Sequence, residues 1–115
     1  MNMHYRPFGR TGFMASQIAA GDVADRSLSL DTCVATLTRA LDAGINVVDT
    51  APGYEDGFSE LIVGAAVRPR RDQVYVIDKI DDFMRPLREQ LAESLQRLEF
   101  DYIAVSYTHL TLPTI

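Results

Sequence analysis

The sequence has little of what a secreted or membrane-embedded domain uses. Cys33 is its one cysteine, so no internal disulfide can form, and an unpaired thiol suits a reducing compartment. The N-terminus lacks the apolar segment of a secretory signal, and the longest apolar stretch, residues 61–67, is far below the roughly 18 residues of a spanning helix. These absences exclude a disulfide-stapled module, and we expect a cytoplasmic protein with no membrane contact.

An excess of basic residues is also missing. The formal net charge is −5, and the one basic run, Arg68-Pro-Arg-Arg71, is short and interrupted by proline. Nucleic acids and anionic membranes are bound by clustered Lys and Arg, so neither is an expected partner. What is present, 47% apolar and 23% charged residues in a chain of 115, is the composition of an ordinary globular domain or of a part of one.

Four short apolar runs recur at intervals of 28 residues, beginning near Ile18, Asn46, Val74 and Tyr102. The second and third runs are rich in β-branched residues and nearly continuous, which is typical of strands that are covered on both faces. Parallel strands are therefore expected, and each parallel pair needs a crossover connection, which is usually a helix.

Helical patterns fill the first two intervals. Over residues 30–43 the apolar positions follow three- and four-residue steps, Ser29 or Asp31 can cap the start, and Gly44 stops the helix. A shorter helix is expected over residues 60–67, with Ser59 as its cap. Each of these segments can pack one apolar face on a sheet.

A third helix is expected to start with Pro86 at its first helical position, where the missing N–H costs nothing. Its apolar residues form one stripe: Leu87, Leu91, Leu95 and Leu98. Gln90 belongs to the polar residues that are expected to face away from the core.

Ahead of the first run, Gly9-Arg-Thr-Gly12 lies between apolar flanks and predicts the tight turn of an antiparallel hairpin. Such a hairpin could plug one end of a barrel. Strand, helix and strand at a fixed period predict an α/β fold with right-handed crossovers, in the form of either a doubly wound sheet or a barrel.

Polar residues follow where the predicted strands end, which is where ligands bind in α/β folds. Asp49 closes the second strand, and Tyr54 follows it after a Pro-Gly turn. Lys79 closes the third strand, and His109 is expected at the end of the fourth. The four side chains are therefore expected at neighbouring strand ends.

These four residue types suit proton transfer to a carbonyl oxygen. A nearby ammonium group stabilises a phenolate and lowers the pKa of a phenol from near 10, so Tyr54 is a candidate general acid and base. Lys79 would supply the ammonium group, Asp49 would keep it protonated, and His109 would orient the substrate oxygen. The set suits hydride transfer to a carbonyl, because the developing alkoxide needs a proton.

Three segments resemble the aldo-keto reductase superfamily. They are Tyr5-Arg-Pro-Phe-Gly-Arg-Thr-Gly12 with Ser16, Gly44-Ile-Asn-Val-Val-Asp-Thr-Ala-Pro-Gly-Tyr54 with Ser59, Glu60 and Gly64, and Glu93-Ser-Leu-Gln-Arg-Leu-Glu-Phe-Asp-Tyr-Ile103. Together they span nearly all of residues 5–105 in the family's order. Two positions depart from the family's pattern: Glu55 stands where glycine is frequent, and Asp78 stands where threonine often precedes the lysine.

The resemblance implies a (β/α)8 TIM barrel that reduces aldehydes or ketones with NADPH or NADH as cofactor. Carried over to matching positions, it implies a catalytic tetrad of Asp49, Tyr54, Lys79 and His109, with Tyr54 as the proton donor. Asp49 and Thr50 are implied on the cofactor side, and no metal is implied. The expected partner is a small carbonyl substrate.

Only a part of that barrel is expected in this chain. Eight units of this period need about 224 residues, near the roughly 250 of such barrels, so residues 1–105 are expected to hold the hairpin and roughly the first four βα units. Residues 106–115 contain no charged side chain and depart from the family. We interpret them as a non-native tail, in which case His109 would fall in register by accident.

Other classes of protein are less well supported. No Gly-x-Gly-x-x-Gly follows a strand, no P-loop is present, and two distant histidines make a metal-dependent hydrolase a weak hypothesis. Two alternatives stay open, namely a non-catalytic nicotinamide-binding regulatory or sensor protein on the same scaffold and a fragment that is inactive alone. In the family most cofactor contacts come from later strands, so we expect no stable NADPH binding by these 115 residues.

Overall fold

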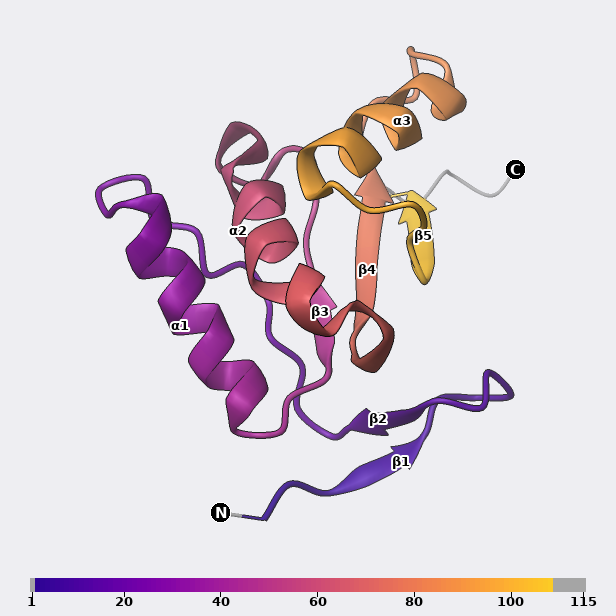
Figure 1. Ribbon diagram of the computed structural model, residues 1–115. Helices are drawn as coiled ribbons and strands as arrows, with labels where there is room; N and C mark the ends of the chain where they lie inside the picture. Colours follow the sequence, from indigo (N-terminus) through magenta and orange to yellow (C-terminus); the bar gives the residue numbers. More distant parts are fainter. Residues whose placement is uncertain (1, 109–115) are drawn as a thin grey trace.

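Strands and helices alternate along most of the chain. The computed structural model describes residues 2–108 (Figure 1). Its main sheet is parallel, in the order β3-β4-β5. The strands are β3 (Val47–Asp49), β4 (Tyr75–Ile80) and β5 (Val105–Thr108), and the helices are α1 (Leu30–Asp42), α2 (Phe58–Val67) and α3 (Leu87–Leu98). Two 3-10 segments flank α2, namely η1 (Tyr54–Gly57) and η2 (Arg68–Gln73).

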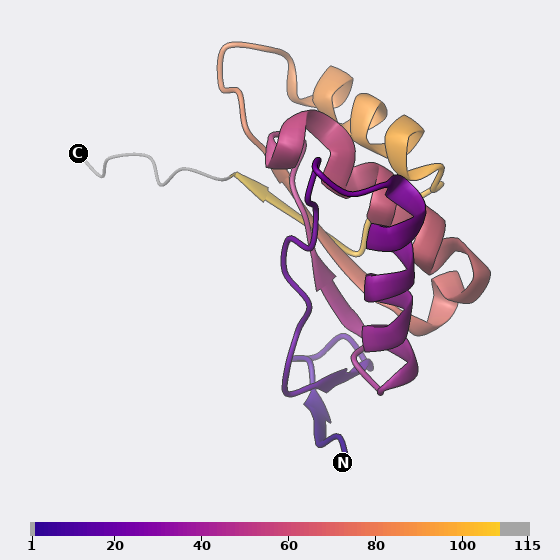
Figure 2. The same cartoon turned by 90° about the vertical axis from the view of Figure 1, so that its left-hand side faces the viewer.

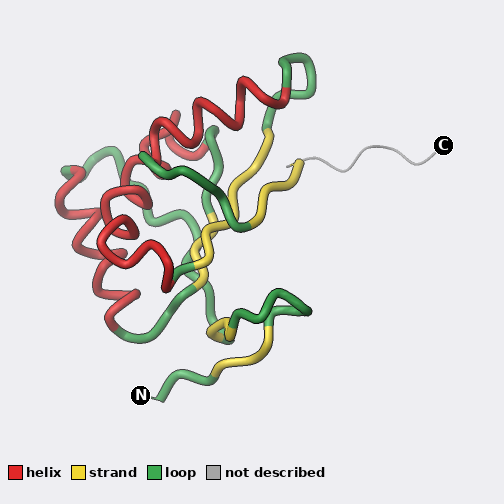
Figure 3. The backbone as a smooth tube through the Cα atoms, turned by 45° about the vertical axis from the view of Figure 1, so that its right-hand side comes forward, coloured by secondary structure: helices red, strands yellow, loops and turns green. Residues whose placement is uncertain are grey.

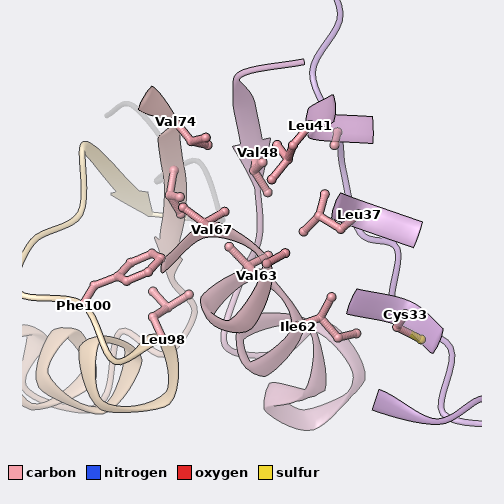
Figure 4. Close-up of a cluster of buried hydrophobic side chains, with 13 residues drawn as sticks. Cys33, Leu37, Leu41, Val48, Ile62, Val63, Val67, Val74, Leu98 and Phe100 are labelled. Carbon is pink, nitrogen blue, oxygen red and sulfur yellow. The ribbon is translucent and has the colours of Figure 1, made fainter. Parts of the chain in front are cut away.

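All three helices lie on one side of the sheet (Figure 2). The core fills the space between them and β3 and β4, and it includes the Cys33 thiol (Figure 4). Its buried side chains from the three helices include Cys33, Leu37, Leu41, Ile62, Val63, Val67 and Leu98. Among residues 2–108, no helix is long and apolar enough to cross a bilayer.

Helix α1 confirms the expected boundaries. The Ser29 hydroxyl accepts a hydrogen bond from the Thr32 N–H at 3.1 Å, which satisfies one of the free donors of the first turn. Gly44 follows the last turn with a φ of 107°, a conformation that favours glycine. The chain then turns directly into β3.

Helix α3 shows that the expected apolar stripe is partly wrong. Leu87 is 56% exposed and Leu91 is 37% exposed, whereas Gln90 and Ser94 are buried. The reason is the loop before the helix, to which the Gln90 amide donates hydrogen bonds at the Asp82 and Arg85 carbonyl oxygens (2.6 and 3.1 Å). These bonds satisfy the buried Gln90 amide, while Leu87 and Leu91 line an open pocket beside Ile80 and Ser106. Pro86 lies one position before the first helical residue.

Two expected strands are shorter than their apolar runs. The run near Ile18 forms a single parallel bridge, Ala20 to Val48, and Ile18 is 54% exposed. The run near Tyr102 becomes β5 only at Val105, because the Arg71 guanidinium binds the Tyr102 carbonyl oxygen at 2.6 Å and stacks on the Tyr102 ring. Consecutive βα units are thus confirmed, but the first of them lacks a regular strand in the described residues.

The expected N-terminal hairpin is present as β1 (Tyr5–Pro7) and β2 (Met14–Ser16), which pair antiparallel. It lies below the amino ends of the parallel strands (Figure 3). The Phe13 ring stacks on Tyr75 with a centroid distance of 3.8 Å, and Tyr75 is the first residue of β4. The hairpin therefore covers the end of the sheet opposite to the strand ends that the sequence singles out.

Several long-range side-chain hydrogen bonds join residues separated by close to the 28-residue period of the apolar runs. The Ser16–Asn46 and Asp49–Lys79 bonds each join residues 30 apart. The Gly53–Asp81 bond joins residues 28 apart. Each of these bonds ties one structural unit to the next one along the chain.

Candidate active site

Asp49 and Lys79 meet at the carboxyl end of the sheet. Asp49 is the last residue of β3, and Lys79 is the last but one of β4. Because the two strands are parallel and in register, their ends lie side by side, and Lys79 Nζ is 2.8 Å from Asp49 Oδ2. The Lys79 side chain is 2% exposed, whereas that of Asp49 is 30% exposed. The carboxylate therefore reaches solvent while it holds a buried ammonium group.

Thr50 is held entirely by contacts within the chain. Its carbonyl oxygen accepts a hydrogen bond from Lys79 Nζ at 2.8 Å, and its N–H donates to the Ile77 carbonyl oxygen at 2.9 Å. Its buried hydroxyl pairs with that of Ser59 at 2.8 Å. Ser59 lies inside the first turn of α2, so its expected role as the cap of that helix is wrong.

Tyr54 follows β3 across a tight turn and comes back to Lys79. The centre of its ring is 4.7 Å from Lys79 Nζ, and its phenol is one of the hydrogen-bonding partners of Lys79. Asp81 fixes the turn from the neighbouring unit, because its Oδ2 accepts a hydrogen bond from the Gly53 N–H at 2.8 Å. Asp81 was not among the expected site residues, although its separation of 28 residues from Gly53 equals the period of the apolar runs.

The residues after Tyr54 adopt an unfavourable backbone conformation. Glu55 and Asp56 have φ values of 49° and 53°, in the left-handed region where residues with a side chain are strained. Glycine adopts this conformation without strain. The strain lies next to the candidate proton donor.

The environment of Lys79 keeps its side chain charged. Burial alone lowers the pKa of the ammonium group, but hydrogen bonds to Asp49 and Tyr54 and electrostatic attraction to both groups outweigh burial. The pKa of Lys79 is therefore raised above its usual value. A permanent positive charge beside a phenol favours the phenolate form, which a proton donor must reach during each turnover.

The structure brings together three of the four expected catalytic residues. His109 lies outside the described residues. Within the described part of β5, the Tyr107 ring lies 5.4 Å from Lys79 Nζ, on a residue that the sequence had not singled out. Carboxylate, ammonium and phenol thus form one connected array at the carboxyl end of the sheet, and an array of this kind can donate and recover a proton.

Comparison with known proteins agrees with this geometry. The model of the Aldo/keto reductase family matches residues 12–114. The chain is 35% identical to the NADH-specific methylglyoxal reductase of Escherichia coli (strain K12), covering 87% of this chain and 37% of that protein. It is 34% identical to the probable voltage-gated potassium channel subunit beta of Oryza sativa subsp. japonica, covering 93% of this chain and 37% of that protein.

A solved structure gives the same result. The chain superimposes on an aldo-keto reductase from Klebsiella pneumoniae in complex with NADPH, with a TM-score of 0.84 and 28% identity. The match covers 99% of this chain and 42% of that one. The chain therefore spans about two-fifths of the length of the proteins that it matches.

Proposed function

Because the chain belongs to the aldo/keto reductase family, we propose that it carries the proton-transfer part of an NAD(P)H-dependent carbonyl reductase. The observation that carries this proposal is the position of Lys79 Nζ, 2.8 Å from Asp49 Oδ2 and 4.7 Å from the centre of the Tyr54 ring. The proposed substrates are small aldehydes and ketones. The name of the Escherichia coli methylglyoxal reductase supports this class of substrate.

In the proposed reaction Tyr54 donates its phenolic proton to the carbonyl oxygen of the substrate. NAD(P)H, when bound, supplies the hydride that the carbonyl carbon takes up. The positive charge of Lys79 stabilises the phenolate that remains, and Asp49 keeps Lys79 charged and in place. In the direction of alcohol oxidation, the same phenolate takes the proton back.

The residues present fit a nicotinamide cofactor at the strand ends. Asp49 keeps 30% of its side chain exposed, so its carboxylate can hold polar groups of the cofactor while it holds Lys79. Thr50 is fully buried and uses its N–H, its carbonyl oxygen and its hydroxyl within the chain. Its proposed contribution to cofactor binding is therefore indirect, through the position of Lys79. His109 stays a prediction as the residue that orients the substrate oxygen.

The activity is proposed for a protein of the relatives' length. The chain covers 37% of the Escherichia coli reductase, and it supplies Asp49, Tyr54 and Lys79 from two consecutive units. We propose that these 115 residues alone do not reduce carbonyls, since a barrel site is built from the loops of several units. Activity measurements therefore need a full-length protein that contains this chain.

Replacement of Tyr54 by phenylalanine tests the proposal. The Tyr54→Phe variant of the full-length protein keeps the ring over Lys79 but has no proton to donate. We expect kcat/KM for methylglyoxal, followed by NADH or NADPH oxidation, to fall by roughly 10²–10⁴-fold while cofactor binding is retained.

The matched control is Tyr5→Phe, which makes the same change in the hairpin at the other end of the sheet. This control is expected to retain turnover. Turnover of Tyr54→Phe equal to that of the unsubstituted protein would overturn the assignment of Tyr54 as proton donor.

A second candidate function is a non-catalytic nicotinamide-binding subunit. Similarity to the protein named as a potassium channel subunit beta favours it, at 34% identity. The contacts of Lys79 with both Asp49 and Tyr54 favour the enzyme. The assay distinguishes the two, because a purely regulatory protein would bind the cofactor without carbonyl-dependent oxidation in any variant.

A further inference from the structure

Asp78 and Lys79 are consecutive residues of β4, and their side chains have partners on opposite faces of the sheet. Lys79 contacts Asp49 and Thr50 in the candidate active site. Asp78 instead contacts Glu60, which belongs to α2 in the helix layer. The exposed fractions are 1% for Asp78 and 0% for Glu60, so two carboxyl groups meet in the interior. The mechanism proposed above uses neither of them.

The hydrogen bonds of this pair leave one oxygen on each side without a donor. Asp78 Oδ1 accepts from the Lys79 N–H at 2.8 Å, and Glu60 Oε1 accepts from Arg97 Nε at 2.6 Å. Asp78 Oδ2 and Glu60 Oε2 are buried and find no donor among the described residues. Two buried carboxylates with unsatisfied oxygens would be costly, whereas one proton between them satisfies both.

The charges around Asp78 are also balanced by one such proton. Arg97 of α3 neutralises Glu60, and Asp49 of β3 accepts from Lys79 Nζ. The partner of Asp78 in β5 is Ser106, which carries no charge. No cation in the described residues other than Lys79 faces Asp78 directly. An ionised Asp78 would therefore partly neutralise the positive charge that Lys79 presents to Tyr54.

We propose that Asp78 and Glu60 share one proton and that the protonated Asp78 is a positioning residue for Lys79. It fixes the backbone N–H of Lys79 without placing a second negative charge beside the ammonium group. The full charge of Lys79 is then left to Asp49 and Tyr54. The shared proton is inferred from the burial and contacts of Asp78 and Glu60, while the role in catalysis rests on the proposed reductase function.

The titration of Asp78 follows from the same environment. Burial, then the hydrogen bond that protonated Asp78 donates to Glu60 and the negative charge of Glu60, raise the pKa of Asp78 to about 8, so the carboxyl group is neutral at pH 7. In the unfolded chain the group titrates near 4. Its contribution to stability is therefore fully present below about pH 4 and is lost as the pH rises to about 8.

Two variants fix position 78 in opposite states. Asp78→Asn imitates the protonated carboxyl group, since its amide can accept from the Lys79 N–H and donate to Glu60. Glu60→Gln offers an amide N–H to Asp78 Oδ2 and keeps an oxygen for Arg97, so it allows Asp78 to ionise. The two variants remove one carboxylate each and are therefore matched in net charge.

The first experiment is a titration of the carboxyl ¹³C resonances in the chain itself, combined with urea unfolding from pH 4 to pH 9. We expect Asp78 to titrate above neutral pH in the unsubstituted chain and below it in Glu60→Gln. The loss of stability between pH 4 and pH 8 should be smaller in Asp78→Asn. A normal titration of Asp78 near pH 4 would overturn the shared proton, even if a variant fails to fold.

The second experiment measures the pH profile of kcat/KM in the full-length protein. An ionised Asp78 reduces the stabilisation of the Tyr54 phenolate by Lys79. Asp78→Asn should therefore move the alkaline limb of the kcat/KM profile to lower pH by roughly half a pH unit. Glu60→Gln should keep the limb of the unsubstituted protein, whose Asp78 is already ionised at that pH. A merely structural role would change the amount of active protein and leave the limb in place.

The outcomes separate the two proposals. Identical limbs in all three proteins, together with a high titration of Asp78, would overturn the positioning role and support the shared proton. Absence of carbonyl reduction in the unsubstituted full-length protein would overturn the proposed function and with it the catalytic role of Asp78. The carboxyl titration decides the shared proton in either case.

Discussion

The two ends of the parallel sheet are built from different chemistry. At the amino end the hairpin is held by neutral contacts: the Asn46 amide binds the backbone of the hairpin, and the Tyr5 hydroxyl donates to the Gly44 carbonyl oxygen at 2.8 Å. At the carboxyl end a buried ammonium group, Lys79, is held by Asp49. One end closes the sheet with interactions that serve stability, and the other keeps charged groups beside solvent, as barrel enzymes do.

The hairpin turn and the turn after α1 differ in backbone strain from the loop after β3. The turn after α1 and the hairpin turn place glycines, Gly44 and Gly12 among them, at positive φ. The loop after β3 places Glu55 and Asp56 there instead. Strain of this kind concentrates at functional sites and is tolerated when the surrounding structure holds it. Stability and activity should therefore respond to different substitutions at the two ends.

The largest expected effect is at Lys79. Lys79→Met removes the ammonium group at nearly constant volume, so Tyr54 loses the charge that stabilises its phenolate. We expect kcat/KM in the full-length protein to fall by at least about 100-fold, with a far-UV circular dichroism spectrum that is unchanged. A rate within tenfold of the unsubstituted protein would contradict the division between the two ends.

An intermediate effect on stability is expected at Asn46. Asn46→Ala removes two hydrogen bonds to the hairpin, from the Ser16 N–H at 2.8 Å and to the Met14 carbonyl oxygen at 2.9 Å. At about 1 kcal/mol each, the free energy of unfolding should fall by about 2 kcal/mol, measured by urea unfolding. The kcat/KM of the full-length protein should change by no more than about twofold, because Lys79 is untouched. A loss of activity comparable to that of Lys79→Met would show that the ends are coupled.

The smallest expected effect is at Glu55. Glu55→Gly removes left-handed strain of about 1 kcal/mol but raises the conformational entropy of the unfolded chain, which offsets part of the gain. We expect a net stabilisation of about 0.5 kcal/mol in thermal unfolding. Gly57→Ala is the matched control, since it places a side chain at a φ of 90° and should destabilise the chain. Destabilisation by Glu55→Gly would mean that the Glu55 side chain makes up for the strain of its backbone.

The site was the more predictable part of the molecule. Asp49 and Lys79 end two consecutive β-branched runs, and parallel strands place such ends side by side whatever the details of packing. Helix α1 was predictable for a similar reason, because Ser29 and Gly44 act on their own backbone within a few residues. Local rules and one topological rule were enough for these features.

Features that depend on contacts outside the patterned segment were not predictable. Gln90 of α3 is buried and bonds to the loop before the helix, and an apolar periodicity does not reveal such bonds. The run at Ile18 yields only a bridge at Ala20, although its composition is that of a strand. Asp78 departs from the resemblance by a single residue, and only the fold places Glu60 against it. In each case the contact that determines the structure involves a residue outside the segment on which the prediction rested.

The recurrence of side-chain bonds at separations of 28 to 30 residues bears on how the chain folds. Each bond closes a loop of one strand and one helix, so every step of assembly meets nearly the same loss of chain entropy. Contacts that close loops of this length form slowly, because the chain entropy is lost before the contacts offset it, and each unit that has formed can then pair with the next one. The Asp49–Lys79 pair would then form as soon as β4 docks on β3, before the later units are in place.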